Sequence, residues 1–211
     1  MSDRPVLPLL DRSREAVLRA ATQLLIENPG ASLAELAASI GIGRTTLHRH
    51  FRDRAELVAA IAGQALDDLE QLYADCGLVL GAEPATARAT ATATATATTT
   101  AGQQALKALL AAAERLIPLG PSLMFLLRDP DIAGHHELTA RAERLDRPLH
   151  AAAATAAAAG LLDPSVPSWW AIETLYATVW VAWEQIEAGR LANRDAPALV
   201  HRTWLTGTAG R

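Results

Sequence analysis

The chain has 211 residues, a formal net charge of −4 and a single cysteine, and half of its residues are hydrophobic. This composition excludes a disulfide-stabilised scaffold, a collagen-like chain and a wholly disordered one. Alanine supplies 46 residues and aromatic residues only 4%; because alanine is the strongest helix former, we expect an all-α fold. We read no signal peptide and no apolar run long enough for a membrane span, and therefore expect a cytoplasmic protein without a membrane partner.

The basic residues are unevenly distributed. Residues 1–57 hold eight arginines against seven acidic residues, whereas the remainder of the chain is net acidic. Within eleven residues, Asp53 is the one acid among six basic or histidine side chains: Arg44, His48, Arg49, His50, Arg52 and Arg54. A local cluster of this kind suits phosphate groups, and a merely solvated basic face would show the same charge pattern.

Two helices are predicted before this cluster. The apolar stripe over residues 17–25 predicts a first helix that begins at Asp11 and ends at Asn28-Pro29-Gly30. Ser32 opens a second helix, because Glu35 three residues later has the spacing of a capping box. The inward face of this second helix is expected to consist of Leu33, Leu36, Ala37 and Ile40.

A tight turn and a third helix follow. Gly41 ends the second helix and can adopt the left-handed backbone that such a turn requires. In the third helix, over residues 44–51, Leu47 and Phe51 point inward at i and i+4. The opposite face then presents polar and cationic groups to solvent: Arg44, Thr45, Thr46, His48 and Arg49. This is the layout of a helix-turn-helix, whose second helix enters the major groove of DNA.

The stretch SLAELAASIGIGRTTLHRHFRDRAEL, residues 32–57, closely resembles the N-terminal domain of the TetR family of bacterial transcriptional regulators. The residues that carry the resemblance are Leu36-Ala37, Ile40-Gly41-Ile42, Thr46-Leu47, and above all Arg49-His50-Phe51 followed by residues 52–57. The resemblance implies a helix-turn-helix DNA-binding domain over residues 1–56. It also implies a helical ligand-binding and dimerisation domain over residues 57–211.

The resemblance assigns the DNA contacts position by position. Three residues match the positions that face base edges: Arg44, Thr45 and Thr46. Arg49 lies on the same exposed face, and His48 stands where the family usually has a tyrosine that bonds a phosphate. His50 matches a histidine that either bonds a phosphate or packs against the first helix. Arg54 matches a phosphate-binding basic residue at the start of the fourth helix, and Ser32 serves as N-cap and phosphate contact alike.

Beyond this domain the chain is again predicted to be helical. Long helices are expected over residues 56–77 and 103–117, and Cys76 is expected to be a small packing residue. Between them, residues 85–101 alternate Ala and Thr. Because this low-complexity repeat has little to bury on either face, it indicates a mobile loop or the weak start of a helix in place of a strand.

Three helices are expected in the last third of the chain. The first covers residues 131–159, the second opens at Ser168, and the last covers residues 196–205. For the second, a strand competes because of its β-forming residues, and acidic residues at helical spacing favour the helix. The resemblance implies that the last two helices pack against a twin chain in a homodimer, around Val179, Val181, Ala182, Leu199 and Trp204.

The resemblance also implies a pocket for a small-molecule effector in the C-terminal domain. Soft or flat apolar side chains are the candidate walls, although each would serve equally as ordinary core: Met124, Phe125, His150, Trp180 and Trp183. The bound ligand would favour a shape in which the two recognition helices no longer match the spacing of their half-sites.

No catalytic or cofactor-binding motif is present in the sequence, so neither an enzyme nor a cofactor is expected. His135-His136-Glu137 is the nearest approach to a metal cluster, but neighbours on a helix point about 100° apart, so no metal site is expected. The expected function is a TetR-like repressor that binds operator DNA as a dimer and is released by a small hydrophobic ligand. The alternative is a helical adaptor or a ligand-sequestering bundle without DNA readout.

Overall fold

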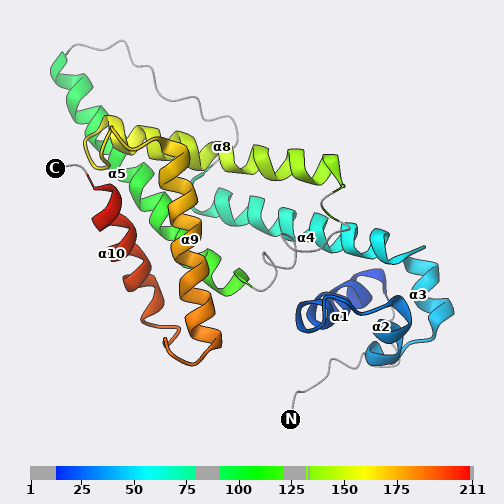
Figure 1. Ribbon diagram of the computed structural model, residues 1–211. Helices are drawn as coiled ribbons and strands as arrows, with labels where there is room; N and C mark the ends of the chain where they lie inside the picture. The colour runs from blue at the N-terminus through cyan, green and yellow to red at the C-terminus, as the bar shows by residue number, and fades with distance from the viewer. Residues whose placement is uncertain (1–12, 79–90, 121–131, 133, 210–211) are drawn as a thin grey trace. The chain divides into compact units, whose positions relative to one another are not determined.

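The computed structural model describes residues 13–78, 91–120, 132 and 134–209, and their regular elements are all helices (Figure 1). The elements in chain order are α1 (Arg14–Glu27), α2 (Leu33–Ile40), α3 (Arg44–His50), α4 (Arg54–Asp75), α5 (Ala91–Leu116), the short 3-10 helix η1 (Ile117–Leu119), α8 (His136–Ala158), α9 (Ser168–Glu187) and α10 (Ala196–Thr208). The predicted all-α class is therefore confirmed. None of the helices in these ranges is long and apolar enough to cross a membrane.

The chain divides into two compact units. The first comprises Met1–Asp68 with Pro121–Arg141, and the second comprises Leu69–Gly120 with Ala142–Arg211. Helices α4 and α8 each contribute residues to both units. The predicted functional division after residue 56 falls inside α4 and stays a prediction.

In the first unit, the helix boundaries follow from local capping. Ser13 caps α1 by accepting a hydrogen bond from the backbone N–H of Ala16 at 3.2 Å, and the expected start at Asp11 lies outside the described residues. Helix α4 begins two residues earlier than predicted, because Asp53 accepts a hydrogen bond from the N–H of Glu56 at 2.8 Å.

The core of the first unit lies where α1, α2, α3 and the start of α4 meet. The predicted inward residues Leu36, Ile40, Leu47 and Phe51 are buried there against Leu25 of α1. Burial of each of these large side chains stabilises the fold by about 1.5–3 kcal/mol. Their shared core fixes which face of α3 remains in contact with solvent.

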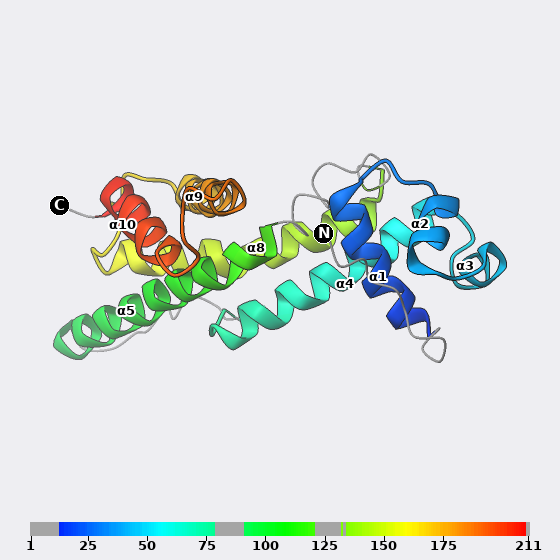
Figure 2. The same ribbon diagram turned by 90° about the horizontal axis from the view of Figure 1, so that it is seen from below.

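In the second unit, α9 and α10 pack side by side, and α5 packs against both (Figure 1 and Figure 2). Fully buried side chains of the unit include Leu109, Leu149, Leu175 and Trp204. Because α9 is helical throughout, the competing prediction of a strand in this segment is excluded.

The Ala-Thr repeat is helical from Ala91 onward, where it forms the first turns of α5. The earlier part of the repeat lies outside the described residues. Further along α5, a side chain added to Gly102 would meet the Cβ of Ala159, so the helix and the end of α8 approach closely at this glycine. Helix α8 begins at His136, and the predicted start at residue 131 lies outside the described residues.

Candidate functional site

The turn between α2 and α3 sets the direction of the recognition helix. Gly41 has a φ of 79°, and its N–H donates to the carbonyl oxygen of Ala37 at 3.1 Å. The N–H of Ile42 donates to the same oxygen at 3.0 Å, and its side chain is buried. A left-handed residue at this point turns the chain sharply, so α3 leaves the turn in a defined direction.

The inner face of α3 is held at two points. Leu47 and Phe51 are buried in the core of the unit. The guanidinium of Arg14, in the first turn of α1, lies 4.8 Å from the centre of the Phe51 ring. A cation over an aromatic face is attracted by the ring electrons, so Arg14 ties the start of α1 to the end of α3.

The outer face of α3 carries the predicted base-contacting residues. Arg44, Thr45 and Arg49 are exposed, and among the described residues none of their side chains has a hydrogen-bond or ion-pair partner. Thr46 is partly exposed on the same helix. Because no internal bond must break first, these side chains are available to hydrogen-bond with base edges and phosphates.

The two histidines of α3 differ in their surroundings. His48 is exposed, and its Nδ1 lies 3.2 Å from the carbonyl oxygen of Arg52. A carbonyl only accepts, so Nδ1 carries the proton in this contact and Nε2 is the ring nitrogen left for an outside partner. His50 is partly buried, with its ring centre 6.4 Å from that of its neighbour Phe51, and its role as phosphate contact or packing residue stays a prediction.

Ser32 and Arg54 both have structural contacts. The Ser32 hydroxyl donates to Glu35 Oε2 at 2.7 Å and accepts from the Glu35 N–H at 3.3 Å. The Arg54 guanidinium donates to the carbonyl oxygens of Pro29 at 2.6 Å and Ala31 at 3.4 Å. The predicted phosphate contacts of these two residues would therefore be made by groups that also hold the fold together.

Two acids near the basic cluster are occupied at the start of α4. Asp53 accepts from the N–H of Glu56 and forms an ion pair with Arg52 at 3.1 Å. The backbone hydrogen bond, followed by the contact with Arg52, lowers the pKa of Asp53. Glu56 in turn accepts from the N–H of Arg52 at 2.8 Å. Asp53 is partly offset by the Arg52 guanidinium and therefore opposes a phosphate less than a free carboxylate would, whereas Glu56 is held only by a backbone N–H.

In the second unit, the structure places three of the five predicted ligand-binding residues. Met124 and Phe125 lie outside the described residues. Trp180 and Trp183 lie one turn apart on α9 with ring centres 4.5 Å apart, and a side chain added to Gly120 would overlap the Trp183 indole. His150 lies on α8. Trp183 Nε1 and His150 Nδ1 are buried without a hydrogen-bond partner in the described part of the chain, a costly arrangement that marks a site worth explaining.

A chain of hydrogen bonds that the sequence does not predict runs across three helices of this unit. Tyr176 of α9 donates to Asp146 of α8 at 2.7 Å, and its oxygen lies 2.9 Å from the hydroxyl of Tyr73, in the last turns of α4. Since the Tyr176 proton is committed to Asp146, Tyr73 is the donor in the second bond. The spacing of Tyr176, Trp180 and Trp183 at i, i+4 and i+7 indicates a shared aromatic face, but it does not point to Asp146 or Tyr73 as partners of Tyr176.

Burial is the largest influence on the pKa values of the three residues in this hydrogen-bond chain. Desolvation raises the pKa of Asp146, and the Tyr176 hydrogen bond and nearby His150 partly offset it, whereas Glu143 adds to it. Burial likewise raises the pKa of Tyr176 and of Tyr73, so both phenols stay protonated at neutral pH. A carboxylate that is costly to keep charged is a common feature of binding sites.

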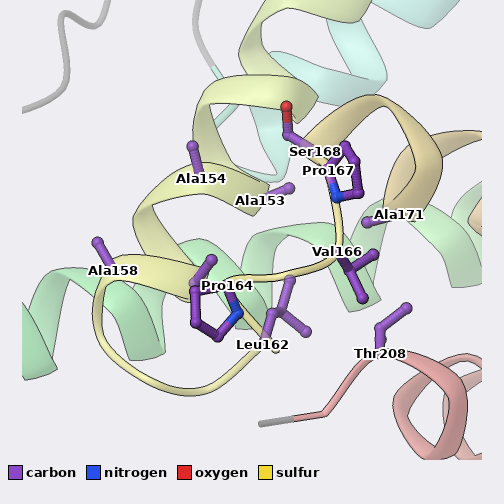
Figure 3. A pocket seen from close by; sticks show the side chains of 11 residues that line it. Ala153, Ala154, Ala158, Leu162, Pro164, Val166, Pro167, Ser168, Ala171 and Thr208 are labelled. Carbon is purple, nitrogen blue, oxygen red and sulfur yellow. The ribbon is translucent and has the colours of Figure 1, made fainter.

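A separate open pocket of about 330 Å³ lies where the end of α8, the following loop and the start of α9 meet (Figure 3). Its lining consists mainly of small apolar side chains such as Ala153, Leu162, Val166 and Ala171. Thr208 is a polar member of this lining, and its hydroxyl already donates to the carbonyl oxygen of Trp204 at 2.8 Å. None of the three predicted ligand-binding residues that the structure describes lines this pocket.

The predicted dimer contacts need correction. Val179, Ala182 and Trp204 are only 2–4% exposed within one chain, so the prediction that they contact a twin is wrong. Trp204 is instead held inside by a hydrogen bond from Nε1 to the carbonyl oxygen of Ala171 at 2.8 Å. An apolar pattern does not distinguish a face that packs on a twin from a face that packs inside its own chain, because a helix in a bundle has apolar residues on its inner face as well.

Four large apolar side chains of α9 and α10 are instead exposed by 40–56%: Trp169, Trp170, Val181 and Leu199. Val181 and Leu199 were among the predicted contacts, whereas Trp169 and Trp170 were not.

His135, His136 and Glu137 are exposed, and no group of three potential metal ligands occurs among the residues that the structure describes.

A model of a known protein family matches most of the helices of the first unit. The family model described as bacterial regulatory proteins, tetR family, matches residues 17–61. This range contains most of α1, all of α2 and α3, and the first turns of α4. The matched range therefore includes every candidate DNA-contacting residue, from Ser32 to Arg54.

Other proteins are similar to this chain over most of its length. The HTH-type transcriptional repressor LfrR of Mycolicibacterium smegmatis is 27% identical over 190 residues, which cover 90% of this chain and 87% of LfrR. The crystal structure of LfrR in complex with proflavine covers 93% of this chain and 97% of its own, with a TM-score of 0.64 and 23% identity. The structure of AibR in complex with isovaleryl coenzyme A and operator DNA covers 92% and 97%, with a TM-score of 0.67 and 17% identity.

Proposed function

We propose that this chain, whose N-terminal domain belongs to the TetR family of bacterial regulatory proteins, represses transcription by binding operator DNA as a homodimer. The observation that carries the proposal is the outer face of α3, where Arg44, Thr45 and Arg49 are exposed and unpaired among the described residues. The alternative, an adaptor or sequestering bundle without DNA readout, gives no reason for a polar, cationic face of this kind on a helix that follows a tight turn.

The roles of the side chains follow from their positions. Arg44, Thr45 and Thr46 read base edges from the first turn of α3, while Arg49, His48 and His50 hold phosphates farther along the helix. Ser32 and Arg54 stand at the starts of α2 and α4, where the helix dipole favours an anion. The DNA-binding domain then comprises residues 1–56, and the ligand-binding and dimerisation domain comprises residues 57–211.

The homodimer uses the apolar surface of α9 and α10. Trp170 and Val181 on α9 and Leu199 on α10 are 52%, 53% and 40% exposed. Large apolar side chains gathered on neighbouring helices favour burial against a partner. A two-fold axis at this surface would present two α3 helices to half-sites about one DNA turn apart.

A small molecule bound in the C-terminal domain releases the repressor. The relatives support this step, because LfrR has been crystallised with proflavine and AibR with isovaleryl coenzyme A and operator DNA. Trp180, Trp183 and His150 supply binding surface, with Met124 and Phe125 as further members. The protein acts in the cytoplasm, where the chromosome is, and we assign it no catalytic activity, no cofactor and no metal.

The test is fluorescence anisotropy of a labelled duplex from upstream of the protein's own gene, with random duplex as reference, over a salt series. Tight, specific binding with a steep salt slope is expected. Thr45→Ala is expected to weaken binding to the specific duplex alone, while Thr139→Ala, an exposed threonine of α8, leaves it unchanged. Equal affinity for specific and random duplexes, together with an empty genome-wide pull-down, would overturn the proposal and favour the adaptor.

A further inference from the structure

We propose that the effector is a cationic aromatic molecule whose positive charge binds the carboxylate of Asp146 and whose rings lie against Trp180 and Trp183. This inference rests on the proposed function, since it names the chemical class of the effector. It departs from the sequence-based expectation of a simply hydrophobic ligand, because Asp146 brings a charge to the site.

In the part of the chain that the structure describes, no arginine or lysine forms an ion pair with Asp146. Asp146 is partly buried and accepts a hydrogen bond from Tyr176 at 2.7 Å. Arg115, an arginine of the same unit, is occupied elsewhere, because it pairs with Asp75 at 2.9 Å. Because a carboxylate offers several acceptor positions and one is used here, the remaining oxygen can accept a charged N–H or lie beside a quaternary nitrogen.

The aromatic surface continues from this carboxylate along α9. Tyr176, Trp180 and Trp183 follow each other at i, i+4 and i+7, and therefore lie on one face of the helix. The two indole rings are in contact, and Trp183 rests against Gly120. Indole faces attract cations more strongly than other aromatic rings do, so this face suits the delocalised charge of a planar aromatic cation better than that of a small inorganic ion.

The remaining polar groups agree with a ligand of this kind. Trp183 Nε1 and His150 Nδ1 are buried without a partner in the described part of the chain, and a heteroaromatic ligand or its bound water can supply one. Glu184, the acid next to Trp183 in the sequence, is exposed and therefore binds a cation less strongly than a partly buried carboxylate does.

The electrostatics favour a cation as well. Burial raises the pKa of Asp146, and the titratable groups around it are Glu143 and His150 on α8, with the phenols Tyr73 and Tyr176 facing it from α4 and α9. A bound cation removes the cost of keeping the carboxylate ionised, whereas a neutral ligand leaves that cost in place.

The same carboxylate is linked to α4. Asp146 holds Tyr176, and Tyr176 accepts from Tyr73 near the end of α4. Helix α4 begins at Arg54, which binds the loop between α1 and α2. A cation that binds the Asp146 carboxylate weakens the hydrogen bond between Asp146 and Tyr176. Because Tyr176 also accepts from Tyr73, ligand binding then changes a contact that holds α4.

A matched pair of dyes tests the charge. N-methylacridinium carries a permanent positive charge, and acridine has nearly the same shape and is neutral at pH 7.5. Each dye is titrated into the full-length protein without DNA by isothermal titration calorimetry. We expect the cation to bind about tenfold more tightly or better, and Asp146→Asn to abolish this preference. Glu173→Gln, which removes an exposed charge of α9, is the matched control and should keep it.

The outcomes separate this inference from the proposed function. Equal binding of the two dyes, binding of neither, or a charge preference that survives in a folded Asp146→Asn protein would overturn the cationic site. Thermal unfolding of each variant shows whether it is folded. Because these titrations contain no DNA, a protein that prefers the cation but binds no operator would contradict the proposed function and leave the cationic site standing.

Discussion

The guanidinium of Arg54 donates a hydrogen bond to the carbonyl oxygen of Pro29 across 2.6 Å, and thereby joins the first turn of α4 to the loop between α1 and α2. A second bond, to the carbonyl of Ala31, strengthens this connection. Ala31 directly precedes the capping residue Ser32 of α2. One side chain thus orients the start of α4 against the segment that leads into the helix-turn-helix.

This connection predicts that Arg54→Ala loses both stability and DNA affinity. Losing charge-assisted bonds to two carbonyls is expected to lower the free energy of unfolding by about 1–3 kcal/mol, and to weaken binding to specific and random duplexes alike. Arg49→Ala is the control, because Arg49 is exposed and has no partner among the described residues. It should leave urea unfolding unchanged and lower the salt slope by about one. Unchanged unfolding of Arg54→Ala would contradict the structural role.

A second prediction concerns the turn before the recognition helix. Gly41 has a φ of 79°, which costs an L-residue about 1–2 kcal/mol, so Gly41→Ala should lower the midpoint of urea unfolding and weaken operator binding. Gly43, with a φ of −69°, is the matched control. An added Cβ there comes no closer than 3.9 Å to Thr46 Oγ1, so Gly43→Ala should unfold like the wild type. Equal midpoints for the two variants would show that the turn tolerates a side chain.

Sequence reasoning worked best in the first unit because its determinants are local. The capping box of Ser32 with Glu35, the left-handed Gly41 and the inward pair Leu47 and Phe51 are all set within a few residues of chain. The contacts of Arg54 escaped prediction because they span more than twenty residues of sequence. Helix α4 starts earlier than the apolar pattern indicates, because Asp53 accepts from the N–H of Glu56, and the position of Asp53 among arginines does not indicate this capping role.

In the second unit, the helices could be predicted but their facing sides could not. An apolar stripe shows that a helix side is buried, but it does not say whether its own chain or a twin covers it. Trp204 illustrates this, because Ala171 holds it inside the chain. Asp146 was missed for the opposite reason: on α8 it reads as one of many charged surface residues, and only the fold brings Tyr176 to it.

A third prediction concerns pH. Burial raises the pKa of Asp146, so the folded protein binds this proton more tightly than the unfolded chain, and the contribution of Asp146 to stability improves as the pH falls. Asp146→Asn keeps an oxygen that accepts from Tyr176 but removes the charge. The variant should therefore melt at a higher temperature than wild type near pH 7, and the difference should shrink towards pH 4. Glu143 and His150 are present in both proteins, so their titration largely cancels. A difference independent of pH would contradict the ionised, desolvated carboxylate.

The fourth prediction isolates the link from the ligand site to α4. Tyr73→Phe removes the hydroxyl that donates to Tyr176 and keeps the buried ring, so it should bind N-methylacridinium as the wild type does. Because α4 is no longer held through Tyr176, the dye should release the variant from operator DNA less effectively, which would appear as a smaller ratio of DNA affinities with and without dye. Tyr176→Phe is the companion variant: it breaks both bonds and should reduce the same ratio at least as much. If Tyr73→Phe kept the full ratio while Tyr176→Phe lost it, the signal would leave Asp146 by another route, and the bond between the two tyrosines would serve packing alone.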